Sequence, residues 1–485
     1  MSKPPKIISD ELGITFNNIS DAAMGIFTPT LRLGVTGLSR AGKTVFITSL
    51  IHNLLTNSSL PAFSAQAEGR LIAAKLSEHP KQTIPRFAYE QHLKAITDKA
   101  PYWPNSTSSI SQIRITLKFQ SNNWLISRFG LSKLNIDIID YPGEWLLDLE
   151  LLNMSFADWS KITLQQSLRP NSKKHSKQFF EVLKKVDLRA DATEPDALSL
   201  KQAFTQYLSK CKKDESSLSI LLPGRFLMPG DLEGSPALSF SPLPAQKNPV
   251  KKTSLYAMFE RRFEAYKSQI VKPFFIEHFA QLDRQIVLVD VLRSLNLGHQ
   301  AISDLEIALE QVLTCFNTGS KNPLMQLITR KIDRILFAAT KADHLHHTSH
   351  NRLEAILKRL VKDATKKAKF TGAQTNSIAL SSIRSTFENE IKQDGEKLHT
   401  IVGYPQRDEK LDKETYDGKT EIALFPGDLP SDTESIFQDK KHPVKLNFLR
   451  FLPPQKFNKN ENNEIILPYI RLDKALEFLI GDWLK

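Results

Sequence analysis

The sequence predicts an α/β protein with a mostly parallel sheet, helices on both faces of that sheet and a large, mainly helical insertion. Strand-like and helix-like segments alternate within residues 1–144 and again within 285–386, which is typical of a sheet assembled from strand–helix units. The intervening segment, 145–284, has helical periodicity and is broken by a stretch rich in Pro, Gly and Ser. One interrupted α/β domain accounts for both halves.

The chain has 485 residues, more than one hydrophobic core of ordinary size requires. Its 41% hydrophobic and 24% charged residues are typical of a globular protein. We divide it into the first part of the α/β domain at 1–144, the insertion at 145–284, the second part at 285–386, and an irregular extension with a closing helix at 387–485.

Charge and cysteine content limit the partners and the compartment. The formal net charge of +12 favours phosphates or an anionic lipid surface, although a solvated basic face is the better explanation, and we expect no specific nucleic-acid partner. Cys211 and Cys315 lie far apart without metal-ligand spacing, which fits a reducing cytoplasm. No uncharged apolar run is long enough to cross a bilayer, so we expect a protein that is neither secreted nor membrane-spanning.

The elements of the first half follow from apolar runs and the residues that break them. Residues 31–36 predict a buried strand, and 44–55 (TVFITSLIHNLL) have the length and apolar spacing of a helix. Residues 113–119 and 134–139 alternate as two further strands, with a hairpin turn near 121–123.

In the second half, we predict strands at 285–290, 334–340 and 377–380, and helices at 301–314, 352–369 and 472–484. The last of these helices is amphipathic. The stretch from 388 to 460 is rich in Pro, Asp and Lys and shows few regular periods.

Between the first strand and the first helix lies the segment GLSRAGKT, a P-loop of the pattern GxxxxGK[ST]. In this motif the glycines let backbone amides turn toward phosphate groups, the lysine neutralises the outer phosphates and the hydroxyl binds Mg²⁺. Lys43 and Thr44 take the last two roles. The predicted phosphate-binding residues are Gly37, Ser39, Arg40, Ala41, Gly42, Lys43, Thr44 and Val45.

A second motif, DYPG, follows the apolar strand that ends at residue 139. Ligands of such sheets bind at the carboxyl ends of the strands, so Asp140 can complete the magnesium shell and the Gly143 amide can contact the γ-phosphate. Glu144 stands where many GTPases have a water-orienting Gln. Asp290, after another apolar strand, competes with Asp140 for the metal, but capping of the following turn explains Asp290 better.

A third motif, TKAD, follows the strand at 334–340 and resembles the guanine-specificity motif [NT]KxD. The Asp343 carboxylate would accept hydrogen bonds from guanine N1 and N2, which adenine cannot offer. Thr340 precedes it, and the Lys341 stem would cover the purine face. Ser381 and Ser382 follow the next strand and resemble the last guanine motif, in which a backbone amide contacts the guanine oxygen.

Two further groups of residues have weaker signals. Thr107 is our first-switch candidate, able to close the magnesium shell, although Ser106, Ser108 and Thr116 fit almost as well. The histidines directly after TKAD lack a carboxylate or Cys partner at metal spacing, so we interpret them as a solvated loop; they are His344, His346 and His347.

Together, the segments GLSRAGKTVFITSL, IDIIDYPGEWLLDL, FAATKADHL and IALSSIRST resemble the YcjX-like family of P-loop nucleotide triphosphatases. The resemblance covers most of the chain. It implies a bacterial cytoplasmic protein, associated with the phage-shock and envelope-stress response and peripheral to the inner membrane, with adjacent envelope-stress proteins as partners.

Arg40 resembles the P-loop arginine that acts as an internal arginine finger in the guanylate-binding protein and atlastin families, although those families lack TKAD. The main hypothesis is therefore a Mg²⁺-dependent GTPase with the Ras-like strand order, which hydrolyses GTP to GDP and changes conformation. Its catalytic group would be Arg40, Lys43, Gly143 and Glu144. An ATPase with an accidental TKAD and a nucleotide-binding scaffold with little turnover are the alternatives.

Overall fold

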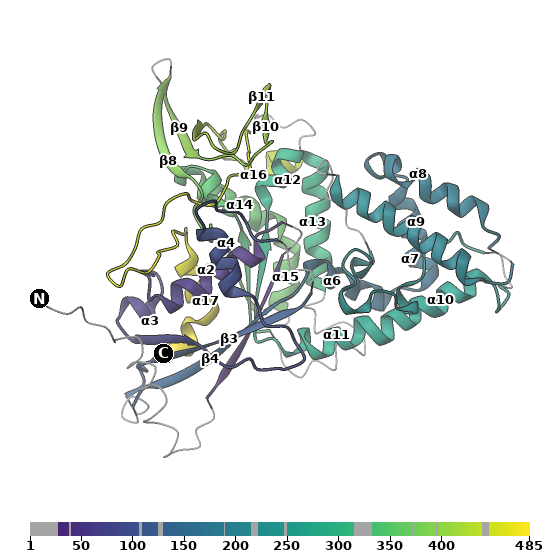
Figure 1. The fold of residues 1–485 in the computed structure, drawn as a ribbon, viewed down its shortest axis with the longest axis horizontal. Helices are drawn as coiled ribbons and strands as arrows, with labels where there is room; N and C mark the ends of the chain where they lie inside the picture. Colours follow the sequence, from purple (N-terminus) through teal and green to yellow (C-terminus); the bar gives the residue numbers. More distant parts are fainter. Residues whose placement is uncertain are drawn as a thin grey trace, which may run out of the picture.

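The structure is a computed structural model (Figure 1). It describes residues 28–37, 40–105, 109–124, 130–188, 190–214, 222–246, 250–314, 332–370, 372–393, 396–438 and 446–485. Within this part of the chain, none of the helices combines the length and the apolar content that crossing a membrane requires.

A seven-stranded sheet forms the centre of the molecule. Its strands, in spatial order, are β2 (Leu71–Leu76), β3 (Ser111–Phe119), β4 (Ser132–Asp140), β1 (Thr30–Gly37), β5 (Arg284–Val289), β6 (Arg334–Ala339) and β7 (Gln374–Ala379). The pairs from β4 to β7 are parallel, and only β3 runs antiparallel to its neighbours. The predicted α/β class with a mostly parallel sheet is confirmed.

Both faces of the sheet are buried, as parallel strands require. Alternate side chains of β5 enter two different cores: Ile286 and Leu288 pack on one side, and Val287 and Val289 on the other. The first core is covered by α2 (Lys43–Leu55) and α17 (Leu472–Ile480), and the second by α12 (Val291–Leu297), α13 (His299–Thr314), α14 (His350–Leu360) and α15 (Lys362–Phe370). Two short helices, α3 (Ser64–Ala67) and α4 (Tyr89–Thr97), lie between β1 and β3 in sequence.

Between β4 and β5 the chain is mainly helical and extends to one side of the sheet (Figure 1). Its helices include α6 (Gly143–Leu147), the 3₁₀ helix η1 (Asp148–Asn153), α7 (Phe156–Ser167), α8 (Pro170–Lys185), α9 (Glu194–Lys213), α10 (Leu255–Tyr266) and α11 (Lys272–Glu277). Aromatic rings fill its interior, with Trp159 stacked on Phe263 and edge-on to Phe204 and Phe240. This core merges with the core on one face of the sheet.

The segment after β7 differs from the irregular extension expected at 387–485. It contains a three-stranded antiparallel sheet of β8 (Phe387–Gln393), β9 (Glu396–Gly403) and β12 (Ile422–Leu424), a pair of two-residue strands, β10 (Lys410–Leu411) and β11 (Glu414–Thr415), and helix α16 (Thr433–Gln438). The β8–β9 hairpin has little apolar alternation because both of its faces are largely polar, and even Phe387 is exposed. Apolar periodicity therefore gave no sign of these strands.

Three smaller differences have simple causes. The edge strand β2 was not predicted because its sequence, LIAAKL, is short and has only one buried residue. The helix expected at 352–369 is two helices, α14 and α15, separated at Val361. The closing helix ends at Ile480 and continues as a 3₁₀ turn to Leu484.

Candidate nucleotide-binding site

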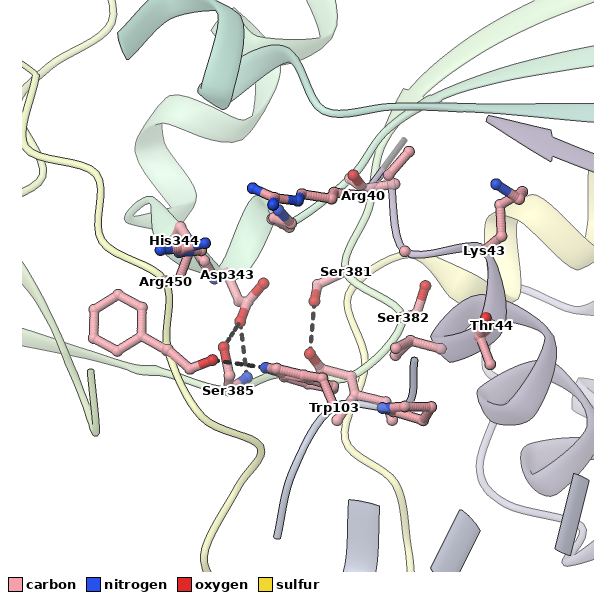
Figure 2. Close-up of a pocket in the computed structure, with 18 of the residues that line it drawn as sticks. Arg40, Lys43, Thr44, Trp103, Asp343, His344, Ser381, Ser382, Ser385 and Arg450 are labelled. Carbon is pink, nitrogen blue, oxygen red and sulfur yellow. Dashed lines mark hydrogen bonds between the residues drawn. The ribbon is translucent and has the colours of Figure 1, made fainter. Parts of the chain in front are cut away.

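A cavity of about 440 Å³ lies at the carboxyl ends of the parallel strands, between the P-loop and the TKAD segment (Figure 2). Its phosphate side is lined by residues 40–45. Its opposite side is lined by Thr340, Lys341, Asp343, Ser381, Ser382 and Ser385. Motifs separated by about three hundred residues in sequence thus share one cavity, as their positions at strand ends predict.

The P-loop connects β1, which ends at Gly37, to α2, which begins at Lys43. Gly42 has a φ of 84°, so the turn into the helix uses a backbone conformation that glycine adopts without strain. No side chain caps this helix, and the first amides of a helix point out of its N-terminus, where an anion can bind. The Lys43 ammonium bonds the Gly37 carbonyl at 3.1 Å, which folds the side chain back along the loop. Ser39 lies outside the described residues.

Arg40 occupies the turn of the P-loop and lines the cavity. Its φ of 66° is unusual for a residue with a Cβ, and its side chain is exposed. In the view of Figure 2 the side chain extends away from Lys43, toward the part of the cavity that holds Asp343 and His344. To act at the phosphate end, Arg40 would have to rotate.

The predicted metal ligands come from the start of α2 and from the end of β4. Thr44 is buried in the first turn of α2 and lines the cavity, and Asp140 is buried at the end of β4, paired in register with Val35 of β1. At the end of β1 the Thr36 hydroxyl is buried, and no described residue hydrogen-bonds to it. Hydroxyl and carboxylate oxygens are the ligands that Mg²⁺ prefers, so the residues present fit this ion.

The other candidates for the metal role are placed elsewhere. Asp290 caps α12, accepting a hydrogen bond from the Arg293 amide at 3.1 Å, as expected. Burial opposes ionisation of Asp290, but the paired Lys341 ammonium holds the pKa of this carboxyl below its usual value. The Thr116 hydroxyl lies within β3 and bonds Asn135 Oδ1 at 2.7 Å, which leaves it away from the cavity. Ser106, Thr107 and Ser108 lie outside the described residues.

The DYPG segment begins α6 and approaches the P-loop through its backbone. A Cβ at Gly143 would overlap the carbonyl oxygen of Gly37, so only glycine allows this approach. Glu144 does not line the cavity. Its carboxylate lies 3.2 Å from the Lys212 ammonium of α9 and is 12% exposed, so the helical insertion holds this side chain.

The insertion also binds the residues that follow Glu144. The Asp148 carboxylate is buried and accepts hydrogen bonds from the Gly224 amide at 2.7 Å, the Arg225 amide at 3.2 Å and the Tyr266 hydroxyl at 2.6 Å. Burial raises the pKa of Asp148 to about 6. The Arg225 guanidinium stacks on the Trp145 ring at 3.5 Å. These contacts fix the segment that would sense the γ-phosphate.

At the other end of the cavity, Asp343 is already oriented. Its Oδ2 oxygen accepts hydrogen bonds from the Ser385 amide at 2.8 Å and the Ser385 hydroxyl at 2.7 Å. Among the described residues none donates to Oδ1, which leaves that oxygen for a ligand. Lys341, with a φ of 61°, pairs with Asp290, while Thr340 is buried beside β5. The base-recognition residues are thus held by side chains of the α/β domain.

The two serines after β7 differ in what they can offer. The Ser381 amide donates to the Ile470 carbonyl at 3.1 Å, and its hydroxyl donates to the Ile383 carbonyl at 2.9 Å. Ser381 therefore has no donor left for a base. The Ser382 carbonyl accepts from Ser49 of α2 at 2.5 Å, which ties this turn to the P-loop helix. The Ser382 amide is one donor that this turn can offer to the cavity, which Ser382 lines.

Several lining residues were not predicted from the sequence. They are Trp103, Pro104, Asn105, His344, Ile383, Ser385, Gln406, Arg450 and Phe451. The Trp103 indole donates to the Phe451 carbonyl at 2.7 Å, which links the loop before β3 to the extension. His344 is buried against the Phe451 ring rather than solvated, and burial lowers its pKa. Trp103, Pro104 and Asn105 alone carried a signal, because they lie just before Thr107, the first-switch candidate.

The fold, the P-loop between β1 and α2, and the cavity at the strand ends define an α/β P-loop nucleotide-binding protein. The model of the YcjX-like family, DUF463, matches residues 31–484, and the chain belongs to this family. It is 37% identical to the Ras-like GTPase YcjX of Escherichia coli (strain K12) over 94% of this chain and 96% of that protein. It is 32% identical to the Ras-like GTPase YcjX of Shewanella oneidensis (strain MR-1), over 98% and 99%.

Proposed function

We propose that this protein is a GTPase that binds GTP with Mg²⁺ and hydrolyses it to GDP. The observation that carries the proposal is the single cavity lined by the P-loop on one side and by Asp343 on the other. A ligand that fills it would place phosphates at the start of α2 and a purine at TKAD. The names of the two relatives, Ras-like GTPase YcjX, support the same activity.

Each end of the cavity has a defined task in this proposal. Lys43 and the first amides of α2 bind the β- and γ-phosphates. Thr44 and Asp140 would hold Mg²⁺, which supplies charge neutralisation at the phosphates. Asp343 accepts guanine N–H groups through Oδ1, while Ser385 keeps the carboxylate in place. Adenine would leave this buried acceptor unpaired, which costs about 1–3 kcal/mol or more.

Hydrolysis needs a further group at the γ-phosphate, and two residues are candidates. Arg40 can supply positive charge as the β–γ bond breaks, once its side chain rotates toward the phosphates. Glu144 can orient water only after it separates from Lys212. Because Lys212 belongs to the helical insertion, conformational change in the insertion and activation of Glu144 are coupled in this scheme.

The test is a competition experiment with nucleotide-free protein. Displacement of a fluorescent GDP analogue by GTP, GDP and ATP is measured with Mg²⁺ and with EDTA, followed by single-turnover hydrolysis of GTP. We expect GTP and GDP to compete at least about a hundredfold better than ATP. Equal competition by ATP would overturn guanine specificity and favour an ATPase. Tight GTP binding without hydrolysis would favour a nucleotide-binding scaffold.

We further propose a role in bacterial envelope stress, at the cytoplasmic side of the inner membrane. Support comes from the resemblance to the YcjX-like family and from the basic net charge of +12, which favours an anionic lipid surface. Sedimentation with vesicles containing anionic lipid, in the GTP and GDP states, tests the membrane contact. Equal recovery with neutral vesicles would argue against it.

A further inference from the structure

A cluster of imidazoles and carboxylates lies beside the nucleotide-binding cavity, outside the residues that line it. Two triads in this cluster, which share His346, have all their ligand atoms within 4.8 Å of one another: His346, His347 and Glu388, and His346, Glu390 and His399. The sequence showed no metal partner for the histidines after TKAD. The structure supplies one through the β8–β9 hairpin, which projects from the body of the molecule (Figure 1).

The hairpin presents two of these groups on paired strands. Glu390 of β8 and His399 of β9 are directly opposite each other in the register. Glu390 Oε1 lies 3.7 Å from His399 Nδ1, while Lys397 holds the other oxygen, Oε2, at 3.1 Å. His399 Nδ1 is buried, and no described residue hydrogen-bonds to it. A buried ring nitrogen without a partner is costly, and a metal ion would satisfy it.

His346 completes this triad from the loop after TKAD. Its ring is 7% exposed and stacks on the His399 ring, with centroids 4.2 Å apart and planes at 19°. The Nδ1 atom bonds Thr348 Oγ1 at 3.0 Å, so Nε2 is the nitrogen left for a ligand. Nε2 lies 3.8 Å from Glu388 Oε2.

We propose that His346, Glu390 and His399 bind one divalent transition-metal ion of the Zn²⁺ class, with Glu388 beside the open coordination position. Imidazole nitrogen and carboxylate oxygen suit such ions. With metal–ligand distances of about 2.0–2.2 Å, tetrahedral ligand atoms lie roughly 3.3–3.6 Å apart. The Glu390–His399 pair, at 3.7 Å, therefore needs only a small side-chain rotation, and the ligand atoms of the whole triad lie within 4.8 Å of one another.

His347 is not assigned to the ligand set, because it is paired with Glu388 and exposed. Its Nδ1 is bonded to Glu388 Oε2 at 2.6 Å, and the side chain is 64% exposed. It lies in the same loop as His346 and provides a matched control. The ion would join the loop that follows Asp343 to the β8–β9 hairpin, and so would stiffen the base-binding end of the cavity.

The test is a metal titration of purified full-length protein that lacks an affinity tag and has been stripped with a chelator. Co²⁺ binding is followed by its visible absorption, and Zn²⁺ binding by competition with a chromophoric chelator. We expect one ion per chain, with a Co²⁺ spectrum of tetrahedral intensity. His399→Ala and Glu390→Gln should each weaken binding by about a hundredfold or more, whereas His347→Ala should retain it.

Thermal unfolding provides a second measurement of metal binding that does not depend on nucleotide and that reveals any variant with a folding defect. Zn²⁺ should raise the Tm of the wild type and of His347→Ala, but not that of His399→Ala, whose metal-free Tm should match the wild type because His399 is partly exposed. A dissociation constant weaker than about 0.1 mM would overturn the site. Wild-type affinity in His399→Ala, or a larger loss in His347→Ala than in His399→Ala, would also overturn it. Neither readout depends on GTP, so failure of the GTPase proposal would leave this result unaffected.

Discussion

The loops that follow β4 and β6 both leave an apolar strand of the same sheet and both carry a nucleotide-binding motif, but they are held differently. After β6, Asp343 faces the cavity and is fixed by Ser385. After β4, Glu144 is paired with Lys212 and lies outside the cavity lining. The base-binding loop is stabilised by the α/β domain and its extension, whereas the loop after β4 is stabilised by the helical insertion.

The difference separates recognition from catalysis. The groups that would choose the base need no rearrangement, because their hydrogen bonds already orient them. Glu144, which would act at the γ-phosphate, is paired with Lys212 of the insertion. Arg225 and Tyr266 of the insertion hold Trp145 and Asp148, which follow it. Binding of a guanine nucleotide and its hydrolysis are therefore expected to respond to different substitutions.

Lys43→Ala should have the largest effect, because both loops can act only on a nucleotide that is held at the P-loop. Loss of a charge-assisted contact to phosphate is worth about 3 kcal/mol, so GTP affinity should fall roughly a hundredfold or more. Isothermal titration with GTP measures it, with the exposed Lys173→Ala on α8 as the control. Unchanged affinity in a folded Lys43→Ala protein would remove the P-loop assignment.

Arg40→Ala should lower kcat for GTP by roughly ten- to a thousandfold and leave GTP affinity nearly unchanged, because the charge acts late in the reaction. Arg40→Lys should restore only part of the rate, since it loses the planar guanidinium. Single-turnover hydrolysis measures both, with Glu144→Gln alongside. A wild-type rate in Arg40→Ala would make Arg40 an ordinary loop residue. A larger fall in kcat for Glu144→Gln than for Arg40→Ala would contradict the view that the insertion holds Glu144 away from the nucleotide, because Glu144 must then leave Lys212 during turnover.

Asp343→Asn should reduce the preference for GTP over ATP by roughly tenfold to a hundredfold while triphosphate binding persists. Ser385 donates two hydrogen bonds to one oxygen of this side chain, so the Asn carbonyl should stay with Ser385 and its NH₂ group should face the guanine N–H. Competition by GTP and ATP measures the preference, with the exposed Asp363→Asn on α15 as the control. A wild-type preference would disprove the TKAD assignment.

The smallest effect concerns Asp148, through which the insertion holds the loop after β4. Its pKa is about 6 in the folded protein against 3.8 unfolded. Its contribution to stability is therefore fully present below about pH 4 and is lost as pH rises through 6, by up to about 3 kcal/mol. Denaturant unfolding of the wild type and of Asp148→Asn measures the free energy of unfolding of each protein between pH 4 and 8. The advantage of the wild type in this free energy should shrink as the pH rises. A constant difference would mean that Asp148 is ionised throughout.

The central strands and their motifs could be predicted from the sequence. An apolar run indicates a buried strand, and an abrupt change to polar residues indicates where the strand ends. The strand at 334–340, for example, is β6 with its end moved by one residue, from Thr340 to Ala339. The pairing of Lys341 with Asp290 was not predictable, because it depends on β5 and β6 being neighbours in space. Ser385 was missed because its contact with Asp343 is set by the turn after β7, which has no periodicity.

The extension shows a different limit. Its strands β8 and β9 are stabilised mainly by backbone pairing and by charged and imidazole side chains, and Ile401 of β9 packs in a small apolar cluster. Hydrophobic periodicity cannot detect such strands. The lining residues Gln406 and Arg450 were also missed, because nothing in their local sequence indicates that the extension returns to the cavity.

Two backbone contacts lie in series between the P-loop and the insertion. Gly143 rests on the Gly37 carbonyl, and Gly224 rests on the carbonyl of Glu144, with no room for a Cβ at either glycine. Side chains elsewhere can rotate to absorb small displacements, but here none lies between the two backbones. Side-chain rotation therefore cannot adjust either contact. A displacement of a few tenths of an ångström at Gly37 must therefore be accommodated by β1 or be transmitted through the two contacts to the helical insertion.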